Sequence, residues 1–161
     1  MIEKEINELQ QQGVQLRHLG QLDQLSPNLQ KKVLNAVEKT RENKRLVLNI
    51  AFNYGGRDEI MHAIQHMLID KVTPEEVTPE KVNSYLYTAG TPDPDLIIRT
   101  SGELRVSNFL IWQGAYSEWY VTPTLWPDFG KAELQKALEE YASRDRRFGK
   151  VEASEYVDSN A

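Results

Sequence analysis

The chain has 161 residues, of which 40% are hydrophobic and 27% are charged, a composition typical of an ordinary globular domain. Its formal net charge of −5 argues against a general nucleic-acid-binding protein, which usually carries a basic excess. Because there is no cysteine, disulfide bonds, thiolate catalysis and cysteine-ligated metals are excluded.

The sequence shows no targeting or membrane segment. Its start, MIEKEINELQQQ, lacks the apolar core of a signal peptide, and no window is as long and apolar as a membrane span. We therefore expect the protein to act in the cytoplasm.

Helices and strands are expected to alternate through the first half of the chain. An apolar stripe predicts a helix over residues 2–12, and a short apolar run predicts a strand over 14–19. Ser26 followed by Pro27 marks the start of the next helix, because serine caps helices and proline favours their first position. The most apolar run, 46–52, is typical of a central parallel strand covered on both faces. This alternation predicts an α/β fold with a mostly parallel β-sheet flanked by helices.

The segment 53–57, with the sequence NYGGR, joins that strand to a helix. A glycine turn before a helix can bind an anion through backbone N–H groups, although paired glycines more often only make a turn. His62 and His66 lie four residues apart on this helix, but no third ligand completes a metal site, so we expect them on the solvated face. The apolar stripe of the helix consists of Ile60, Ile64, Met67 and Leu68.

Further helices are marked by their capping residues. Residues 73–76, with the sequence TPEE, form a capping box, and the Thr-Pro pair at 78–79 starts a helix that should reach Tyr87. Asp128 is expected to cap the last helix, and the polar residues 150–161 are expected to fray. The apolar stripe of the last helix consists of Leu134, Leu138 and Tyr141.

The stretch 95–120 carries most of the groups that could bind a ligand. The β-branched run 96–99 predicts a buried strand that brings Arg99 to its carboxyl end, where open α/β sheets bind ligands. A polar loop with a glycine follows, and Asn108 can cap a helix with the sequence NFLIWQGA. Together with Arg105, these hydroxyls, guanidinium groups and helix N–H groups favour a phosphate or diphosphate.

Glu118 lies just beyond this predicted helix, at the start of another apolar strand, and its carboxylate is a suitable oxygen ligand for Mg²⁺. A structural interpretation of the charged groups stays open at this point. In that interpretation, Arg99 and Arg105 belong to an ion-pair network on a loop. Their partners would be Glu103 and Asp95.

Aromatic residues are frequent in and just after this stretch. They could line a lipid pocket or a partner surface, but for most of them we expect ordinary core positions, with a subunit interface for the others. They are Trp112, Tyr116, Trp119, Tyr120 and Trp126.

The stretch resembles the C-terminal signature of the cis-prenyltransferases, the undecaprenyl diphosphate synthase family. A match this long and ordered is far more specific than a lone glycine motif, and NYGGR resembles another recurring family segment. The resemblance covers nearly the whole chain, up to Gly149. The matching signature residues are Asp95, Arg99 to Glu103, Arg105, Ser107 to Phe109, Trp112, Gln113, Ala115, Tyr116, Glu118 and Leu125 to Phe129.

The resemblance implies an activity and its substrates. Family members condense isopentenyl diphosphate onto an allylic diphosphate, such as farnesyl diphosphate, to make an undecaprenyl-type carrier lipid with cis double bonds. By resemblance, Arg99, Arg105 and Ser107 would bind isopentenyl diphosphate. Glu118 would bind Mg²⁺, and Glu103 would orient the two arginines.

The resemblance also implies a homodimer, with no nucleic-acid partner and at most peripheral membrane contact through the lipid product. Family members carry an Arg-x-Gly end that reaches the diphosphate of the neighbouring subunit. Here Arg147 would orient that end, and a main-chain N–H near Gly149 would touch the phosphate. The strand 46–52 would help to line the lipid tunnel, for which Phe52 is a bulky wall residue.

Two upstream family motifs do not occur in the sequence. One resembles MDGNGRWA and supplies an aspartate for Mg²⁺, and the other resembles SxENWxRP. We therefore expect residues 1–149 to be the C-terminal portion of a single cis-prenyltransferase domain, with its first two strands and catalytic aspartate missing. A sheet without those strands exposes unpaired edges, which predicts poor solubility or obligate oligomers for the isolated chain.

Two other functions stay open. A non-catalytic scaffolding subunit of a two-chain prenyltransferase would keep the fold, but such subunits tend to lose the arginine, serine and glutamate set that is present here. A generic phosphate-binding module would be distinguished by whether simple nucleotides compete for the site.

Overall fold

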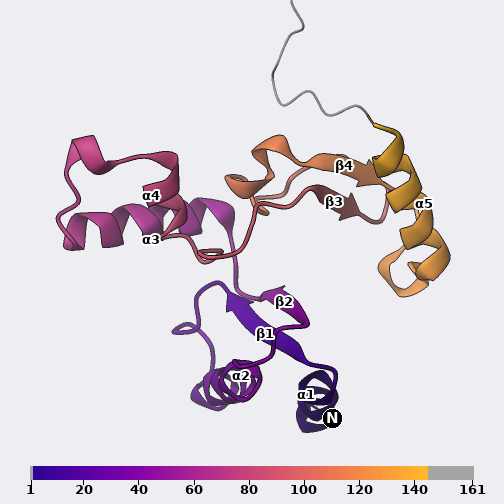
Figure 1. The fold of residues 1–161 in the computed structure, drawn as a ribbon, viewed down its shortest axis with the longest axis horizontal. Coiled ribbons are helices and arrows are strands. Elements are labelled where there is room, and N and C mark those ends of the chain that lie inside the picture. Colours follow the sequence, from indigo (N-terminus) through magenta and orange to yellow (C-terminus); the bar gives the residue numbers. More distant parts are fainter. Residues whose placement is uncertain (1, 145–161) are drawn as a thin grey trace, which may run out of the picture. The chain divides into compact units, whose positions relative to one another are not determined.

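The computed structural model describes residues 2–144, and Figure 1 shows their secondary structure. The chain divides into two compact units. Among the described residues, the first consists of 2–92 with Ser107–Trp112, and the second of Asp93–Val106 with 113–144.

The first unit begins with alternating helices and strands, as the sequence predicts. Its strands pair in parallel, with Val14 opposite Leu46 and Leu19 opposite Ala51. The first two helices pack on the same face of this pair (Figure 1). The elements are α1 (Ile2–Gln11), β1 (Val14–Leu19), α2 (Pro27–Thr40), β2 (Leu46–Ala51) and α3 (Gly56–Ile69).

Strand β2 is not covered on both faces, and this prediction is wrong for the described part of the chain. Its only strand neighbour there is β1, and the helices α1 and α2 pack on one face. Apolar side chains therefore remain exposed along the strand and just after it. They are Leu46, Val47, Leu48, Ile50 and Phe52, with exposed fractions between 37% and 57%.

Helix α3 buries a different face from the one its apolar stripe predicts. The buried residues are Gly56, Glu59, Ala63 and Met67, of which only Met67 belongs to the predicted stripe, whereas Leu68 is 71% exposed. Glu59 is fully buried and accepts hydrogen bonds from the Tyr54 hydroxyl at 2.5 Å and the Tyr87 amide at 2.8 Å. The buried carboxylate of Glu59 therefore ties Tyr54, in the NYGGR segment, to helix α3.

The histidine pair lies beside this buried face. His66 is exposed, as predicted, while His62 is half-buried and its ring packs on that of Tyr87. The two imidazole centroids are 3.9 Å apart. Burial and the neighbouring His66 lower the pKa of His62, which favours its neutral form.

Two short helices complete the first unit: η1 (Pro74–Glu76) and α4 (Pro79–Asn83). The capping box is present, since the Thr73 amide donates to Glu76 Oε2 at 2.8 Å. Helix α4 ends earlier than predicted, because the chain from Ser84 onward forms turns.

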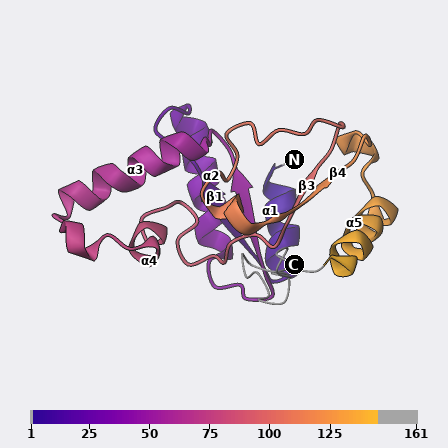
Figure 2. The ribbon, with the colours of Figure 1, turned by 90° about the horizontal axis from the view of Figure 1, so that it is seen from above.

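The second unit is built on another parallel pair, in which Leu96 lies opposite Glu118 and Arg99 opposite Val121. Helix α5 packs beside β4, as Figures 1 and 2 both show. The elements are β3 (Leu96–Arg99), η2 (Gln113–Tyr116), β4 (Glu118–Val121), η3 (Trp126–Asp128) and α5 (Lys131–Ser143).

Two further predictions, which concern mainly the second unit, are wrong. Asp128 does not cap α5, because it ends η3 and Phe129 is extended, so that the helix begins after Gly130. None of the five aromatic residues expected in the core or at an interface is buried: Tyr116 and Trp126 are 73% and 75% exposed, and Trp112, Trp119 and Tyr120 are half-buried. Four of them belong to the second unit, where a single helix beside a two-stranded sheet leaves too little covering to bury them.

Among the described helices, none combines the length and the hydropathy that a membrane crossing would need.

Candidate functional site

Two guanidinium groups converge on one carboxylate at the carboxyl end of β3. Arg99 Nη2 donates to Glu103 Oε2 at 2.8 Å, and Arg105 Nη2 forms an ion pair with the same oxygen. Arg99 Nη1 also donates to the main-chain oxygen of Arg105 at 2.6 Å. Arg99 is 22% exposed and Arg105 is 61% exposed, so the cluster is accessible from solvent.

The cluster carries an excess of positive charge. Hydrogen bonds from Arg99 and then Arg105 hold the pKa of Glu103 below its usual value, so this carboxylate stays ionised at neutral pH. Two guanidinium charges against one carboxylate leave a net charge of about +1, which suits an anionic ligand. These contacts are consistent with an anion-binding site and also with an ion-pair network that only stabilises the loop.

The loop after β3 is held by the segment after β4. The amide of Ser101 donates to Thr124 O at 3.0 Å, and that of Gly102 donates to Thr122 O at 2.8 Å. Both donors have a left-handed backbone, with φ of 67° and 73°. These two N–H groups are therefore used within the fold, and the loop would bind an anion through its side chains.

The helix predicted from Asn108 onward is absent. The expectation that the N–H groups at its start help to bind a phosphate is therefore wrong. Residues 107–112 form turns, and the short 3-10 helix η2 comes directly after them. Ser107, Asn108 and Leu110 have φ values of 49°, 61° and 45°. A left-handed backbone costs about 1–2 kcal/mol per residue outside glycine, so other contacts must hold this segment.

Those contacts lie at the start of α3. The Gly56 amide donates to Asn108 O at 2.7 Å, and the Arg57 amide donates to Asn108 Oδ1 at 2.8 Å. Asn108 therefore caps a helix 51 residues earlier in the chain instead of its own. The same contacts occupy two of the N–H groups with which the NYGGR turn could have bound an anion, which agrees with the preferred interpretation of the glycine pair as a turn.

The glycines of NYGGR are required by this close approach. A Cβ atom at Gly56 would lie 2.7 Å from Ile111 Cγ1, and one at Gly55 would lie 2.7 Å from Asn108 Nδ2. Neither glycine has a positive φ. The sequence offers one signal for this arrangement. A helix that starts at two glycines has no side chain there to cap it, so a cap from elsewhere in the chain is indicated.

Gly56→Ala is expected to destabilise the protein although alanine favours helices over glycine by about 1 kcal/mol. The clash with Ile111 should cost about 1–3 kcal/mol, as overpacking does elsewhere. The urea midpoint of unfolding checks this result. Gly130→Ala is the matched control, because nothing lies within 4 Å of its Cβ position. Equal midpoints for the two variants would contradict the account of the glycine pair.

Glu118, the predicted Mg²⁺ ligand, is the first residue of β4 and is paired with an arginine. Arg144, which follows α5, donates from Nη1 to Glu118 Oε2 at 2.7 Å and forms a second ion pair with Glu140. Both carboxylates raise the pKa of Arg144, Glu118 more strongly. The described residues contain no group of three or more His, Cys, Asp or Glu side chains that could hold a metal ion.

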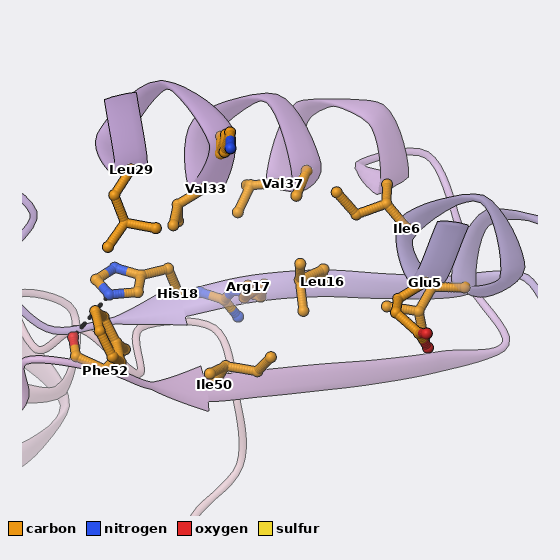
Figure 3. Close-up of a pocket in the computed structure, with 13 residues that line it drawn as sticks. Glu5, Ile6, Leu16, Arg17, His18, Leu29, Val33, Val37, Ile50 and Phe52 are labelled. Atoms are coloured by element: carbon orange, nitrogen blue, oxygen red, sulfur yellow. Dashed lines mark hydrogen bonds between the residues drawn. The ribbon is translucent and has the colours of Figure 1, made fainter. Parts of the chain in front are cut away.

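An apolar cavity of about 300 Å³ lies in the first unit, between the helices α1 and α2 and the β1–β2 pair. Figure 3 shows Val33 and Val37 of α2 above Leu16, with Ile50 on the neighbouring strand and Phe52 at one end. At that end, His18 Nε2 donates to the main-chain oxygen of Phe52 at 2.8 Å.

Comparison with known proteins identifies the family. Residues 1–149 match the family model described as "Putative undecaprenyl diphosphate synthase". The chain belongs to the undecaprenyl diphosphate synthase family. The resemblance stated from the signature residues is therefore confirmed.

Relatives in the undecaprenyl diphosphate synthase family support this assignment. The isoprenyl transferase of Heliobacterium mobile is 49% identical over 154 residues, which cover 93% of this chain and 59% of the relative. That of Clostridium perfringens is 47% identical and covers 93% of this chain and 61% of the relative. The chain thus spans about three fifths of the length of these curated relatives.

Solved structures of the family confirm the α/β fold with parallel strands. A probable undecaprenyl diphosphate synthase from Campylobacter jejuni matches with a TM-score of 0.84 and 32% identity, covering 92% of this chain and 69% of that one. Lavandulyl diphosphate synthase from Lavandula x intermedia, solved in complex with dimethylallyl diphosphate, matches with a TM-score of 0.85 and 35% identity, covering 92% and 66%.

The predicted site residues fall into three groups according to where they lie in the chain: in the second unit, in the first unit, or outside the described residues. Arg99, Glu103 and Arg105 are brought together in the second unit, which also holds Glu118. Ser107 belongs to the first unit. The proposed roles of Arg147 and Gly149, and the expected frayed tail, lie outside the described residues. Two roles were not predicted from the sequence: that of Asn108 as a cap for α3, and that of Arg144 as the partner of Glu118.

Proposed function

We propose that the chain forms part of an enzyme that condenses isopentenyl diphosphate onto an allylic diphosphate and so extends a prenyl chain with cis double bonds. The observation that carries this proposal is the convergence of Arg99 and Arg105 on Glu103 at the carboxyl end of a parallel strand. Membership of the undecaprenyl diphosphate synthase family supports the reaction class.

The proposed task of the arginine cluster is to hold the diphosphate of isopentenyl diphosphate. Glu103 keeps both guanidinium groups oriented toward one point before the ligand binds, which lowers the entropy cost of binding. A diphosphate carries more negative charge than the single carboxylate, so it can take over the guanidinium N–H donors of Arg99 and Arg105. Ser107 would add a hydroxyl donor. Holding the diphosphate places the alkene for attack on the allylic carbon.

A magnesium ion remains a proposal for this family member. Glu118 offers one oxygen ligand, but its Oε2 is bound by Arg144, and the described residues supply no complete set of ligands around it. One carboxylate does not make a magnesium site. We therefore propose Glu118 as a single ligand whose companions lie outside the described residues, and we derive no step through the metal.

The apolar cavity in the first unit is proposed to receive the growing hydrocarbon chain. Its walls come from α1, α2 and the strands β1 and β2, and they are apolar as a prenyl tail requires. The bulky Phe52 lies at one end of this cavity (Figure 3). This supports the predicted role of the strand segment 46–52 as a tunnel wall.

In an enzyme that joins this chain to the part of the Heliobacterium mobile relative that it does not cover, Val33→Trp should shorten the products. The new side chain would fill the cavity, because Val33 points into it from α2 (Figure 3). The length distribution of the reaction products, resolved by chromatography, measures the effect. Leu34→Trp is the matched control, because Leu34 is on the same helix but is 56% exposed and does not line the cavity. Products of unchanged length from Val33→Trp would remove the cavity from the proposed tunnel.

Several properties of the whole protein also remain proposals. They are assembly as a homodimer, action in the cytoplasm, and the place of residues 1–149 as the C-terminal portion of one domain. The exposed apolar side chains along β2 support the last of these, since the described residues leave that strand without a second neighbour.

A binding measurement tests the proposed substrate. Isopentenyl diphosphate added to the chain should shift the side-chain NMR signals of Arg99 and Arg105, and excess ATP should not displace it. Displacement by ATP would favour a generic phosphate-binding module. No shift at either arginine would contradict the proposed site.

A further inference from the structure

We infer that Asn108 is a positioning residue, which caps helix α3 and thereby sets the conformation of Ser107. The second part of this inference rests on the proposed function, because Ser107 matters as a proposed ligand of isopentenyl diphosphate. The cap itself does not depend on that function.

The first step concerns the helix end that needs a cap. The first N–H groups of a helix have no partner within the helix. Helix α3 begins after Gly55, which has no side chain that could accept a hydrogen bond. Asn108 supplies two acceptors there, its main-chain oxygen for Gly56 and its Oδ1 for Arg57. One residue from a distant loop therefore satisfies two donors.

The second step concerns the backbone of the loop. The carbonyl oxygen of Asn108 accepts a hydrogen bond from Gly56, and its side chain accepts one from Arg57. These two bonds hold the backbone of Asn108 in the left-handed region, with a φ of 61°. Asparagine tolerates that region better than most residues. A residue with no acceptor would lose one of the two hydrogen bonds, and a residue with a bulky or branched side chain would add strain.

The third step connects Asn108 with Ser107. Residues 109–112 are held by further contacts within the first unit. The Phe109 ring packs edge-on against Tyr54, with 5.9 Å between the ring centroids, and Trp112 Nε1 donates to Asn83 Oδ1 at 2.6 Å. Ser107 is the first residue of this segment in the first unit. Its own left-handed backbone therefore depends on the fixed peptide that it shares with Asn108.

Two variants separate the cap from the backbone strain. Asn108→Gly adopts a left-handed backbone easily but has no side-chain acceptor, whereas Asn108→Asp keeps an acceptor oxygen and tolerates the same backbone. Hydrogen exchange of the Arg57 amide should become about 10-fold faster in Asn108→Gly, the effect of losing roughly one hydrogen bond, and stay near its native rate in Asn108→Asp. Native exchange in Asn108→Gly would overturn the cap.

The link to Ser107 has a readout that does not require activity. The amide chemical shift of Ser107 should move in Asn108→Gly and should stay close to its native position in Asn108→Asp. An unmoved Ser107 signal in Asn108→Gly would overturn the positioning role. If isopentenyl diphosphate fails to bind the native chain while these two results hold, the proposed function fails and the cap stands.

Discussion

Arg99→Ala should weaken the use of isopentenyl diphosphate by about 10- to 100-fold in kcat/KM, the value of a charge-assisted hydrogen bond of roughly 1.5–3 kcal/mol. The assay needs a joined enzyme, in which this chain is fused to the part of the Heliobacterium mobile relative that it does not cover. Arg99 is the less exposed of the two arginines and contacts both Glu103 and Arg105. Its loss therefore removes a ligand donor and loosens the second guanidinium group.

The pattern of the kinetic change is as informative as its size. KM for isopentenyl diphosphate should rise, while KM for farnesyl diphosphate should stay within about twofold, because the proposed site serves one substrate. Arg41→Ala is the matched control, since Arg41 is an exposed arginine that pairs only with neighbouring carboxylates, Glu38 and Glu42, among the contacts described. Unchanged kinetics for isopentenyl diphosphate in Arg99→Ala would remove the assignment.

Glu118→Gln should lower kcat of the joined enzyme by about 100-fold or more, the scale seen when a group that stabilises developing charge is removed. Glutamine keeps the size of the side chain but cannot offer a charged oxygen to Mg²⁺, and it loses the ion pair with Arg144. The Mg²⁺ concentration that gives half-maximal activity should also rise.

The matched control for this change is Glu140→Gln, which removes the other carboxylate that pairs with Arg144 and leaves Glu118 in place. We expect this exposed ion pair to contribute little, so that activity changes by less than about threefold. If Glu118→Gln keeps the native Mg²⁺ dependence, Glu118 is not a metal ligand and its bond to Arg144 is structural.

Local sequence signals predicted the strands well. The predicted strands at 14–19 and 96–99 match β1 and β3, because each is a short apolar run bounded by glycine or polar residues. The capping box at Thr73 was also predicted correctly, because its donors and acceptors lie within four residues of each other.

Predictions failed where a distant residue decides the local structure. Asn108 has the chemistry of a helix cap, but its acceptors are used by Gly56 and Arg57. The partner of Glu118 was missed in the same way, because Arg144 lies 26 residues further along the chain. The role of Glu118 as a magnesium ligand stays a prediction. No periodicity in the sequence connects such pairs, and the tertiary contacts override the local preference.

Incorporation of radiolabelled isopentenyl diphosphate into polyprenyl products, with farnesyl diphosphate and Mg²⁺, shows whether this chain forms part of an enzyme that extends prenyl chains. The chain alone and the joined enzyme are measured side by side. We expect labelled product from the joined enzyme and none from the chain alone, because the chain spans only part of its relatives and holds no complete metal site in its described residues. Absence of product from a folded joined enzyme would contradict the proposed reaction, and product from the chain alone would contradict the account of the metal site.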